Sequence, residues 1–191
     1  MRKVIAVAAS VGGGKSSLTT ALAQALDDAP VLRFDDYQTA TRQSVDELEA
    51  WLAAGADFDV LQAPGLADEL ARLRGGPEQG GWLVFEMPLG RAYSATAAAI
   101  DLLVWLDVPL DVALARKLRE LAHGAHNAPQ ADARDALRWI DDYLGHYLAT
   151  VRKVLDVQRT RVPAAADLVL DGCAATGELV RQVLERSAEG A

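Results

Sequence analysis

Short apolar runs alternate along the chain with longer segments in which apolar positions recur at helical spacing. The runs at residues 82–85 and 101–107 are too uniformly apolar for half-exposed strands, which is typical of a parallel sheet covered on both faces. We expect strands at residues 3–9, 31–34, 82–85, 101–107 and 167–170. We expect helices over residues 15–27, 44–54, 66–73, 109–122, 131–159 and 176–187. This order predicts an α/β fold, a doubly wound parallel sheet of about five strands with helices on both faces.

A glycine-rich turn joins the first expected strand to the first expected helix. Residues 9–16 read A-S-V-G-G-G-K-S, and Ala9 stands where the pattern G-x-x-x-x-G-K-S/T has its first glycine. Consecutive glycines let backbone N–H groups turn inward onto phosphate oxygens, at the positive end of the following helix. Lys15 would reach the outer phosphates, and the Ser16 hydroxyl would ligate magnesium. This context predicts a nucleotide-phosphate site made by Val11, Gly12, Gly13, Gly14, Lys15, Ser16 and Ser17.

Acidic residues end two of the expected strands. Asp35 and Asp36 follow the second strand, and Glu86 follows the third. Ligands bind outside the carboxyl ends of the strands in such sheets. Phosphoryl transfer to a hydroxyl uses one carboxylate to accept the proton and another near the metal, roles that suit Asp35 and Glu86. The structural alternatives are a strand-terminating turn at Asp35-Asp36 and an ion-paired Glu86, and whether Asp35 or Asp36 is the base stays open.

Basic residues cluster on the helix expected after the fourth strand. Arg116 and Arg119 are three residues apart and share a helical face, so two guanidinium groups could close over a transferring phosphoryl group. Residues 110–130 would then act as a small lid or phosphate clamp. The alternative is a solvated face, with Glu120 nearby.

Taken as a set, these motifs resemble the uridine kinase, nicotinamide riboside kinase and phosphoribulokinase superfamily of phosphate-loop kinases. The likeness rests on residues 12–17, 34–37, 58–61, 85–86 and 116–119, which occur in the family's order. The resemblance implies that ATP and Mg²⁺ bind at the phosphate loop. It further implies that Asp35 is the catalytic base, that Glu86 helps to hold the metal and that the arginines cover the phosphates.

The resemblance also implies where an acceptor binds. The pocket would be lined by Asp35, Tyr37, Phe58, Asp59 and Glu86. In that family, the acid matching Asp59 binds sugar hydroxyls and the aromatic ring matching Phe58 packs on the base. Pro64-Gly65 and Met87 depart from the family pattern around this pocket. Arg91 lies beyond the end of the third strand, where it would contact the acceptor or the nucleotide phosphates, or else lie on the surface.

Composition limits the compartment and the partners. A formal net charge of -8 argues against a nucleic-acid or anionic-membrane partner, which would require a basic face. The lone Cys173 is compatible with a reducing compartment, and no run of about eighteen apolar residues is present. We expect a cytoplasmic protein with a single domain over residues 1–191, acting on a small-molecule hydroxyl acceptor. Whether it is a monomer or a homodimer stays open.

The main hypothesis is an ATP-dependent kinase for a hydroxyl of a small, uncharged nucleoside or nucleoside-like riboside, of the uridine or nicotinamide riboside type. The alternatives are a kinase of a non-nucleoside alcohol, such as pantothenate or glycerate, and a catalytically silent ATP-binding regulator. A GTPase of the Ras kind is excluded, because Asn127 is the only asparagine and Ala128 follows it instead of lysine. The sequence leaves open the acceptor, the choice between ATP and another donor, and the role of the helix over 131–159. For Tyr143 and Tyr147, on one face of that helix, packing is the simpler expectation.

Overall fold

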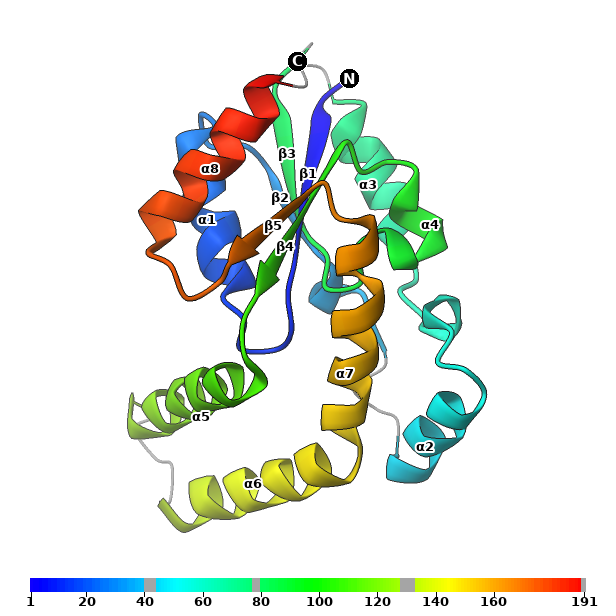
Figure 1. Ribbon diagram of the computed structural model, residues 1–191, viewed down its shortest axis with the longest axis vertical. Helices are drawn as coiled ribbons and strands as arrows, with labels where there is room; N and C mark the ends of the chain where they lie inside the picture. The colour runs from blue at the N-terminus through cyan, green and yellow to red at the C-terminus, as the bar shows by residue number, and fades with distance from the viewer. Residues whose placement is uncertain (40–43, 77–79, 128–132, 190–191) are drawn as a thin grey trace.

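The computed structural model describes residues 1–39, 44–76, 80–127 and 133–189. Its strands are β1 (Lys3–Ala8), β2 (Val31–Arg33), β3 (Trp82–Glu86), β4 (Leu102–Asp107) and β5 (Leu168–Asp171). They form one five-stranded sheet in the order β2-β3-β1-β4-β5, and every pairing is parallel (Figure 1). The helices are α1 (Lys15–Ala25), α2 (Val45–Ala53), α3 (Leu66–Arg74), α4 (Ser94–Ala97), α5 (Leu110–Asn127), α6 (Ala133–His146), α7 (Arg152–Arg161) and α8 (Thr176–Glu189). The predicted doubly wound parallel sheet is confirmed.

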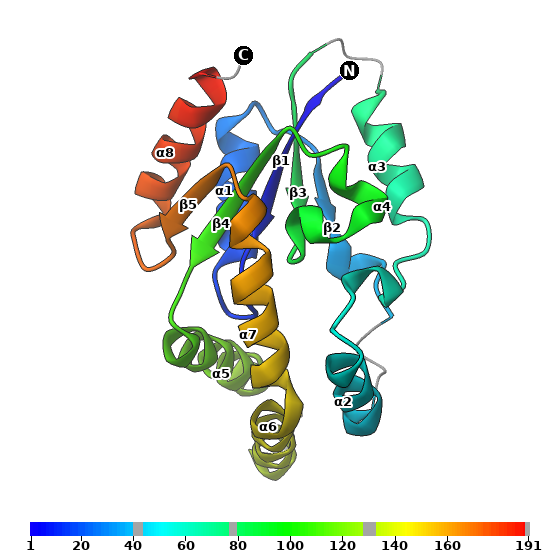
Figure 2. The same ribbon diagram turned by 45° about the vertical axis from the view of Figure 1, so that its right-hand side comes forward.

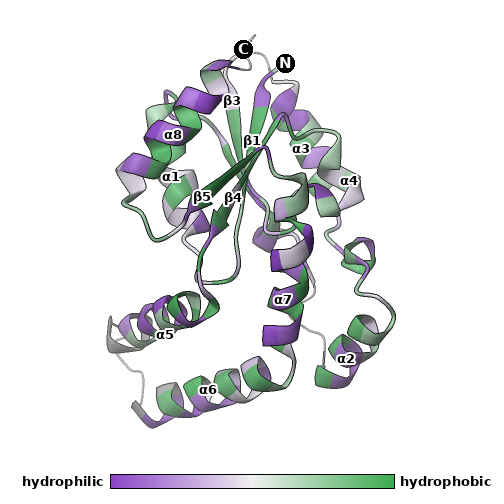
Figure 3. Cartoon of the chain, in the orientation of Figure 1, coloured by the Kyte–Doolittle hydropathy of each residue, from purple (hydrophilic) through white to green (hydrophobic). Residues whose placement is uncertain are grey.

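Both faces of the sheet are buried. Along β1, Ile5 and Val7 join the apolar cluster that includes residues of α1 and α8, whereas Val4 and Ala6 join the cluster on the face of α3 and α7. The strands are therefore hydrophobic along their length, while hydrophobic and hydrophilic residues alternate along the helices (Figure 3). Within the described ranges, no helix is both long and apolar enough to cross a membrane. Because helices cover both faces of the sheet, the sequences of the strands are continuous apolar runs.

The segment expected as one helix over 131–159 is bent. The α-helical hydrogen-bonding pattern is interrupted by a π-helical turn, Tyr147–Val151, between α6 and α7. Gly145 precedes this turn, and the Thr150 hydroxyl donates to the His146 carbonyl at 3.3 Å, two features that favour a bend. As a result α7 packs along the sheet while α6 turns away beyond the carboxyl ends of the strands (Figure 1).

Three helices lie beyond the carboxyl ends of the strands, with α6 between α2 and α5 (Figures 1 and 2). A capping box begins α2, since the Glu47 N–H donates to Ser44 Oγ at 3.2 Å and the Ser44 N–H donates to Glu47 Oε2 at 2.7 Å. Helix α5 continues to Asn127, past the expected end at Ala122, because a single glycine at position 124 weakens a helix without ending it. The expected lid over 110–130 corresponds to α5, and residues 128–130 lie outside the described residues.

We predict that the core around β4 carries much of the stability. Trp105 is 1% exposed, while its register partner on the edge strand β5, Val169, is 53% exposed. Trp105→Ala should lower the free energy of unfolding by about 3–5 kcal/mol, because it opens a cavity in the core. The matched change Val169→Ala should cost less than about 1 kcal/mol. Urea unfolding measures both values, and equal losses in the two variants would contradict this packing.

Candidate active site

The glycine-rich loop between β1 and α1 has a backbone that side chains would disturb. Gly12 and Gly14 have φ angles of 73° and 87°, in the left-handed region that favours glycine. A Cβ atom on Gly12 would lie 2.1 Å from the carbonyl oxygen of Ala113 on α5. The loop and the first turn of α5 are therefore in direct contact.

The departure at Ala9 is accommodated within the loop itself. Ala9 is fully buried, and a Cβ atom on Gly13 would lie 2.7 Å from the Ala9 methyl group. The methyl group thus occupies space left by the missing side chain at position 13. The Gly13 N–H also donates to the Ser10 carbonyl at 2.9 Å, which closes the turn. Alanine in place of the first glycine is compatible with a closed phosphate loop.

Lys15 begins α1 and turns back over the loop. Its Nζ donates to the carbonyl oxygens of Ala9 and Ser10, both at 3.2 Å. Burial lowers the pKa of the Lys15 ammonium, whereas the nearby carboxylates of Asp35 and Glu86 act in the opposite direction. The cation therefore lies close to both strand-end acids that the sequence singled out.

Glu86 and Ser16 are hydrogen bonded to each other. The Ser16 hydroxyl donates to Glu86 Oε1 at 2.7 Å, and the Thr19 hydroxyl lies 3.4 Å from Oε2. The Glu86 residue is 5% exposed, and its only ion pair among the described residues is with Arg33 Nε at 3.5 Å. The two residues that were each expected at the metal are therefore in direct contact. Thr19 and Arg33 were not predicted, although Thr19 lies three residues after Ser16 on the same helix face.

This pair fits a magnesium ion better than a metal held by protein alone. The described residues contain no group of three or more His, Cys, Asp or Glu side chains that could hold a metal. Mg²⁺ is commonly bound by one or two protein oxygens together with substrate phosphates, and a serine hydroxyl and a carboxylate are such oxygens. Ser16 and Glu86 therefore have the chemistry of that kind of site.

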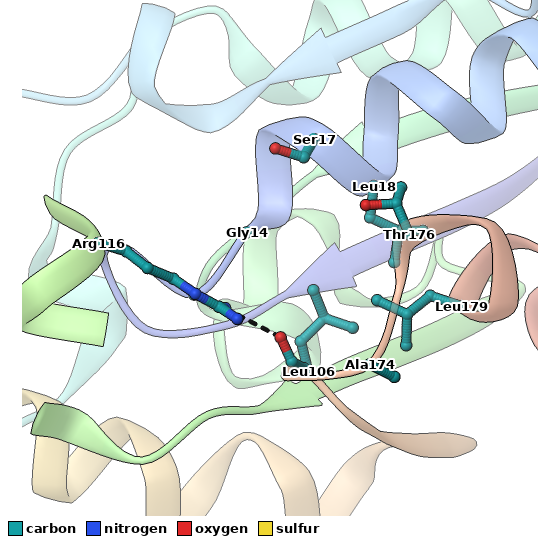
Figure 4. A pocket seen from close by; sticks show the side chains of 10 residues that line it. Gly14, Ser17, Leu18, Leu106, Arg116, Ala174, Thr176 and Leu179 are labelled. Carbon is teal, nitrogen blue, oxygen red and sulfur yellow. Dashed lines mark hydrogen bonds between the residues drawn. The ribbon is translucent and has the colours of Figure 1, made fainter. Parts of the chain in front are cut away.

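Two adjoining cavities flank the loop. The larger, of about 460 Å³, is lined by Gly12, Gly14, Lys15, Ser16, Ser17, Arg116 and Glu120. The smaller, of about 160 Å³, has Leu106 and Leu179 among its apolar walls (Figure 4). Figure 4 shows Arg116 extending from α5 past Gly14 toward the segment after β5, where its Nη1 donates to the Gly172 carbonyl at 2.9 Å. A polar, cationic compartment beside a smaller one with partly apolar walls suits the phosphates and the base of a nucleotide.

Only one of the two arginines predicted as a clamp lies at the loop. Arg116 lines both cavities, whereas Arg119 is exposed and lines neither of them. Positions 113, 116, 117 and 120 follow helical spacing, so they share the face of α5 that is turned toward the loop. Position 119 lies off that face. Lys117 instead lies near Lys15 and lowers its pKa, and it pairs with Glu120 at 2.9 Å. Arg119 is therefore corrected to a surface residue.

Asp35 lines a third cavity, of about 720 Å³. This cavity lies between the end of β2, α2 and the bent segment of α6, and its described lining is Phe34, Asp35, Gln38, Ser44, Val45, Leu48, Trp139, Tyr143, His146, Thr150 and Val151. Asp36 is not among these residues. Of the two acids, Asp35 is the one that lines this cavity, and its charge also raises the pKa of Lys15.

Three residues expected at the acceptor pocket have structural partners elsewhere. Phe58 is 3% exposed and packs against Trp51 at a centroid distance of 5.7 Å, so its ring offers no open face to a base. Asp59 accepts from the Ser94 N–H at 2.7 Å and so caps the start of α4. Tyr37 is partly buried against the apolar cluster and does not line the cavity. The cavity beside Asp35 is lined instead by residues of α6.

Arg91 is directed away from the phosphate loop. Its guanidinium donates to the Ala165 carbonyl at 2.8 Å and pairs with Asp167 at 2.7 Å. Asp167 also accepts from the Leu103 N–H at 2.7 Å, near the amino ends of β4 and β5. Since ligands bind at the opposite ends of the strands, Arg91 is corrected to a structural tie.

Gln158 on α7 was not predicted and connects α7 to the loop. It is 5% exposed, and its Nε2 donates to the Ala9 carbonyl at 3.2 Å and to the Pro88 carbonyl at 2.7 Å. Pro88 lies just beyond β3, so Gln158 joins the ends of two neighbouring strands. A glutamine in a polar stretch of helix carries no signal of this contact in the sequence.

We predict that Gly12→Ala weakens nucleotide binding at the loop. The new methyl group would meet the Ala113 carbonyl, and a left-handed alanine costs about 1–3 kcal/mol, so α5 must shift away from the loop. Calorimetric titration with ATP should show a loss of affinity of about tenfold or more. Gly177→Ala on α8, where a Cβ atom would meet open space, is the matched control and should bind ATP normally. Equal affinities for both variants would show that this close contact is not required.

Solved structures of small-molecule kinases resemble this chain. Shikimate kinase from Aquifex aeolicus aligns over 100% of both chains with a TM-score of 0.51 and 17% sequence identity. A gluconokinase from Sinorhizobium meliloti covers 98% of this chain and 92% of its own, with a TM-score of 0.50 and 18% identity. Deoxyadenosine kinase from M. mycoides covers 97% of this chain and 99% of its own, with a TM-score of 0.52 and 10% identity.

At such identities the likeness establishes the fold. No protein-family model matches the chain, and no curated protein matches it. The five-stranded parallel sheet, with a glycine-rich loop after β1 and helices around it, is the phosphate-loop fold that is also found in shikimate kinase.

Proposed function

We propose that this protein is an ATP-dependent kinase that phosphorylates a hydroxyl group of a small, uncharged nucleoside or nucleoside-like riboside. The observation that carries the proposal is the position of Asp35. Its carboxylate lies close enough to Lys15 to influence the lysine pKa, and it also lines the 720 Å³ cavity. A general base must lie between the phosphoryl donor and the acceptor hydroxyl, and the position of Asp35 supports that role.

Different residues have different roles in phosphoryl transfer. The loop N–H groups and Lys15 bind the phosphates of ATP, and Arg116 neutralises charge on their other side. Ser16 and Glu86 would hold Mg²⁺, which when bound neutralises charge on the phosphate oxygens. Asp35 orients the acceptor hydroxyl and accepts its proton as the hydroxyl oxygen bonds to the γ-phosphorus. The bond from the γ-phosphorus to the bridging oxygen breaks, and ADP leaves.

The lining of the acceptor cavity supports an uncharged acceptor. Among the described residues that line it, none is lysine or arginine. Arg42, the only lysine or arginine in residues 35–64 of the sequence, lies outside the described residues. The structural neighbours are named for shikimate, gluconate and deoxyadenosine, of which the first two are carboxylates and the third is a nucleoside. An anionic acceptor would need a cation to pair with its charge, so we favour the nucleoside class.

We further propose that the protein acts in the cytoplasm on a diffusible metabolite, with no nucleic-acid or membrane partner. The net charge of -8 supports this, since both of those surfaces repel an acidic protein. The oligomeric state stays open between monomer and homodimer.

Acceptor-dependent ADP release tests the proposal. Purified protein with Mg²⁺ and ATP should release ADP when uridine, nicotinamide riboside or deoxyadenosine is added. Asp35→Asn should lower kcat by about 10²–10⁴-fold, because the general base is lost, while calorimetry shows unchanged ATP affinity. Asp36→Asn is the matched control and should remain active, because Asp36 does not line the cavity.

Two further results decide between the alternatives. Activity with pantothenate or glycerate alone would identify a kinase of non-nucleoside alcohols. Lys15→Ala should lose turnover, because its charge is required at the phosphates. ATP binding without turnover on any acceptor would contradict the kinase proposal and leave a nucleotide-binding regulator.

A further inference from the structure

Trp139 and Tyr143 form a stacked aromatic pair on α6. They are four residues apart, and their rings lie 5.5 Å apart at an interplanar angle of 8°. Both line the 720 Å³ cavity that also holds Asp35. Trp139 is 49% exposed, in contrast to Trp51 at 8% and Trp105 at 1%. A large indole thus keeps an uncovered surface beside the proposed acceptor site.

The bend between α6 and α7 places this pair opposite α2. The π-helical turn Tyr147–Val151 redirects the chain, so α6 runs beneath the carboxyl ends of the strands rather than along the sheet (Figure 1). Val45 and Leu48 on α2 line the facing side of the same cavity. The space between α2 and α6 therefore has an aliphatic wall and an aromatic wall, with Asp35 beside both.

Two hydroxyls of this cavity are already engaged, whereas the buried hydroxyl of Tyr143 has no hydrogen-bond partner among the described residues. The Ser44 hydroxyl is engaged with Glu47 in the capping box, and the Thr150 hydroxyl donates to the His146 carbonyl. In the described lining, no lysine or arginine offers a partner to a carboxylate or phosphate. Asp35 can accept a hydrogen bond from one hydroxyl. These groups suit an uncharged ligand with a hydroxyl near Asp35 better than a sugar acid.

We propose that the acceptor is an alcohol carrying a flat, non-anionic aromatic or heteroaromatic ring, and that the ring is recognised by Trp139 and Tyr143 on α6. The phosphorylation of its hydroxyl rests on the proposed function, whereas the ring contact does not require turnover. The ring packs against the uncovered indole surface, and the hydroxyl lies beside Asp35. Aromatic side chains stack on many different flat rings. The site would therefore select acceptors that carry such a ring, without selecting one particular nucleobase.

Substitution of Trp139 tests the ring contact in kinetics. Trp139→Ala should raise KM for uridine or deoxyadenosine by about tenfold or more, with kcat changed less than about threefold, because the ring binds equally in the ground and transition states. Trp139→Phe keeps an aromatic face and should restore most of the affinity. Leu137→Ala, at a position on α6 that is 65% exposed and does not line the cavity, is the matched control. Unchanged KM values in Trp139→Ala would overturn the proposal.

Tryptophan fluorescence separates this proposal from the kinase proposal. Uridine or nicotinamide riboside, added without ATP, should quench the fluorescence of the wild-type protein, and Trp139→Phe should abolish the quenching. Quenching that depends on Trp139, in a protein that releases no ADP, would support ring recognition and contradict the kinase. A different result would support the kinase and overturn ring recognition. In that case gluconate or shikimate would give a kcat/KM for ADP release at least equal to that of the ring-bearing alcohols, and Trp139→Ala would leave this kcat/KM unchanged. Absence of both quenching and turnover would overturn both.

Discussion

The hydrogen bond from Ser16 to Glu86 holds the site together. Glu86 ends β3 in the interior, where an unpaired ionised carboxylate would cost several kcal/mol. The hydroxyls of Ser16 and Thr19 on α1 and the guanidinium of Arg33 at the end of β2 offset that cost. The loop between β1 and α1 is thereby fixed relative to β2 and β3. The position of Asp35, two residues beyond Arg33, follows from the same set of contacts.

The bent segment α6–α7 links the two halves of the site. At its α7 end, Gln158 donates to the carbonyl of Ala9 at the start of the loop and to that of Pro88 beyond β3. At its α6 end, Trp139 and Tyr143 line the acceptor cavity. The Glu120 carboxylate on α5 lines the phosphate cavity and also contributes to the raised pKa of Tyr143, which burial raises most. The phosphate loop, α5 and the part of α6 that carries Tyr143 therefore lie close together.

The sequence predicted those features that depend on local chain geometry. A glycine-rich loop needs only its own residues and the strand and helix around it, and strand-end acids converge because parallel strands end at one edge of the sheet. Phe58 and Asp59 were placed at the site because of a resemblance, and Arg91 because it follows a strand end. Each has a tertiary partner that no local pattern reveals. Arg119 shows a different limit, since two residues three apart share a face only approximately. The α6 lining of the cavity beside Asp35 was missed because a π-helical turn inside a helical pattern decides where α6 lies.

A crystal structure with Mn²⁺ and a non-hydrolysable ATP analogue tests the central claim most directly. Mn²⁺ replaces Mg²⁺ on oxygen ligands and can be located by its anomalous scattering. We expect the triphosphate on the N–H groups of residues 12–17, and one anomalous peak at bonding distance from Ser16 Oγ on the side of Glu86. A nucleotide bound away from the loop, or a metal peak distant from both Ser16 and Glu86, would contradict the account.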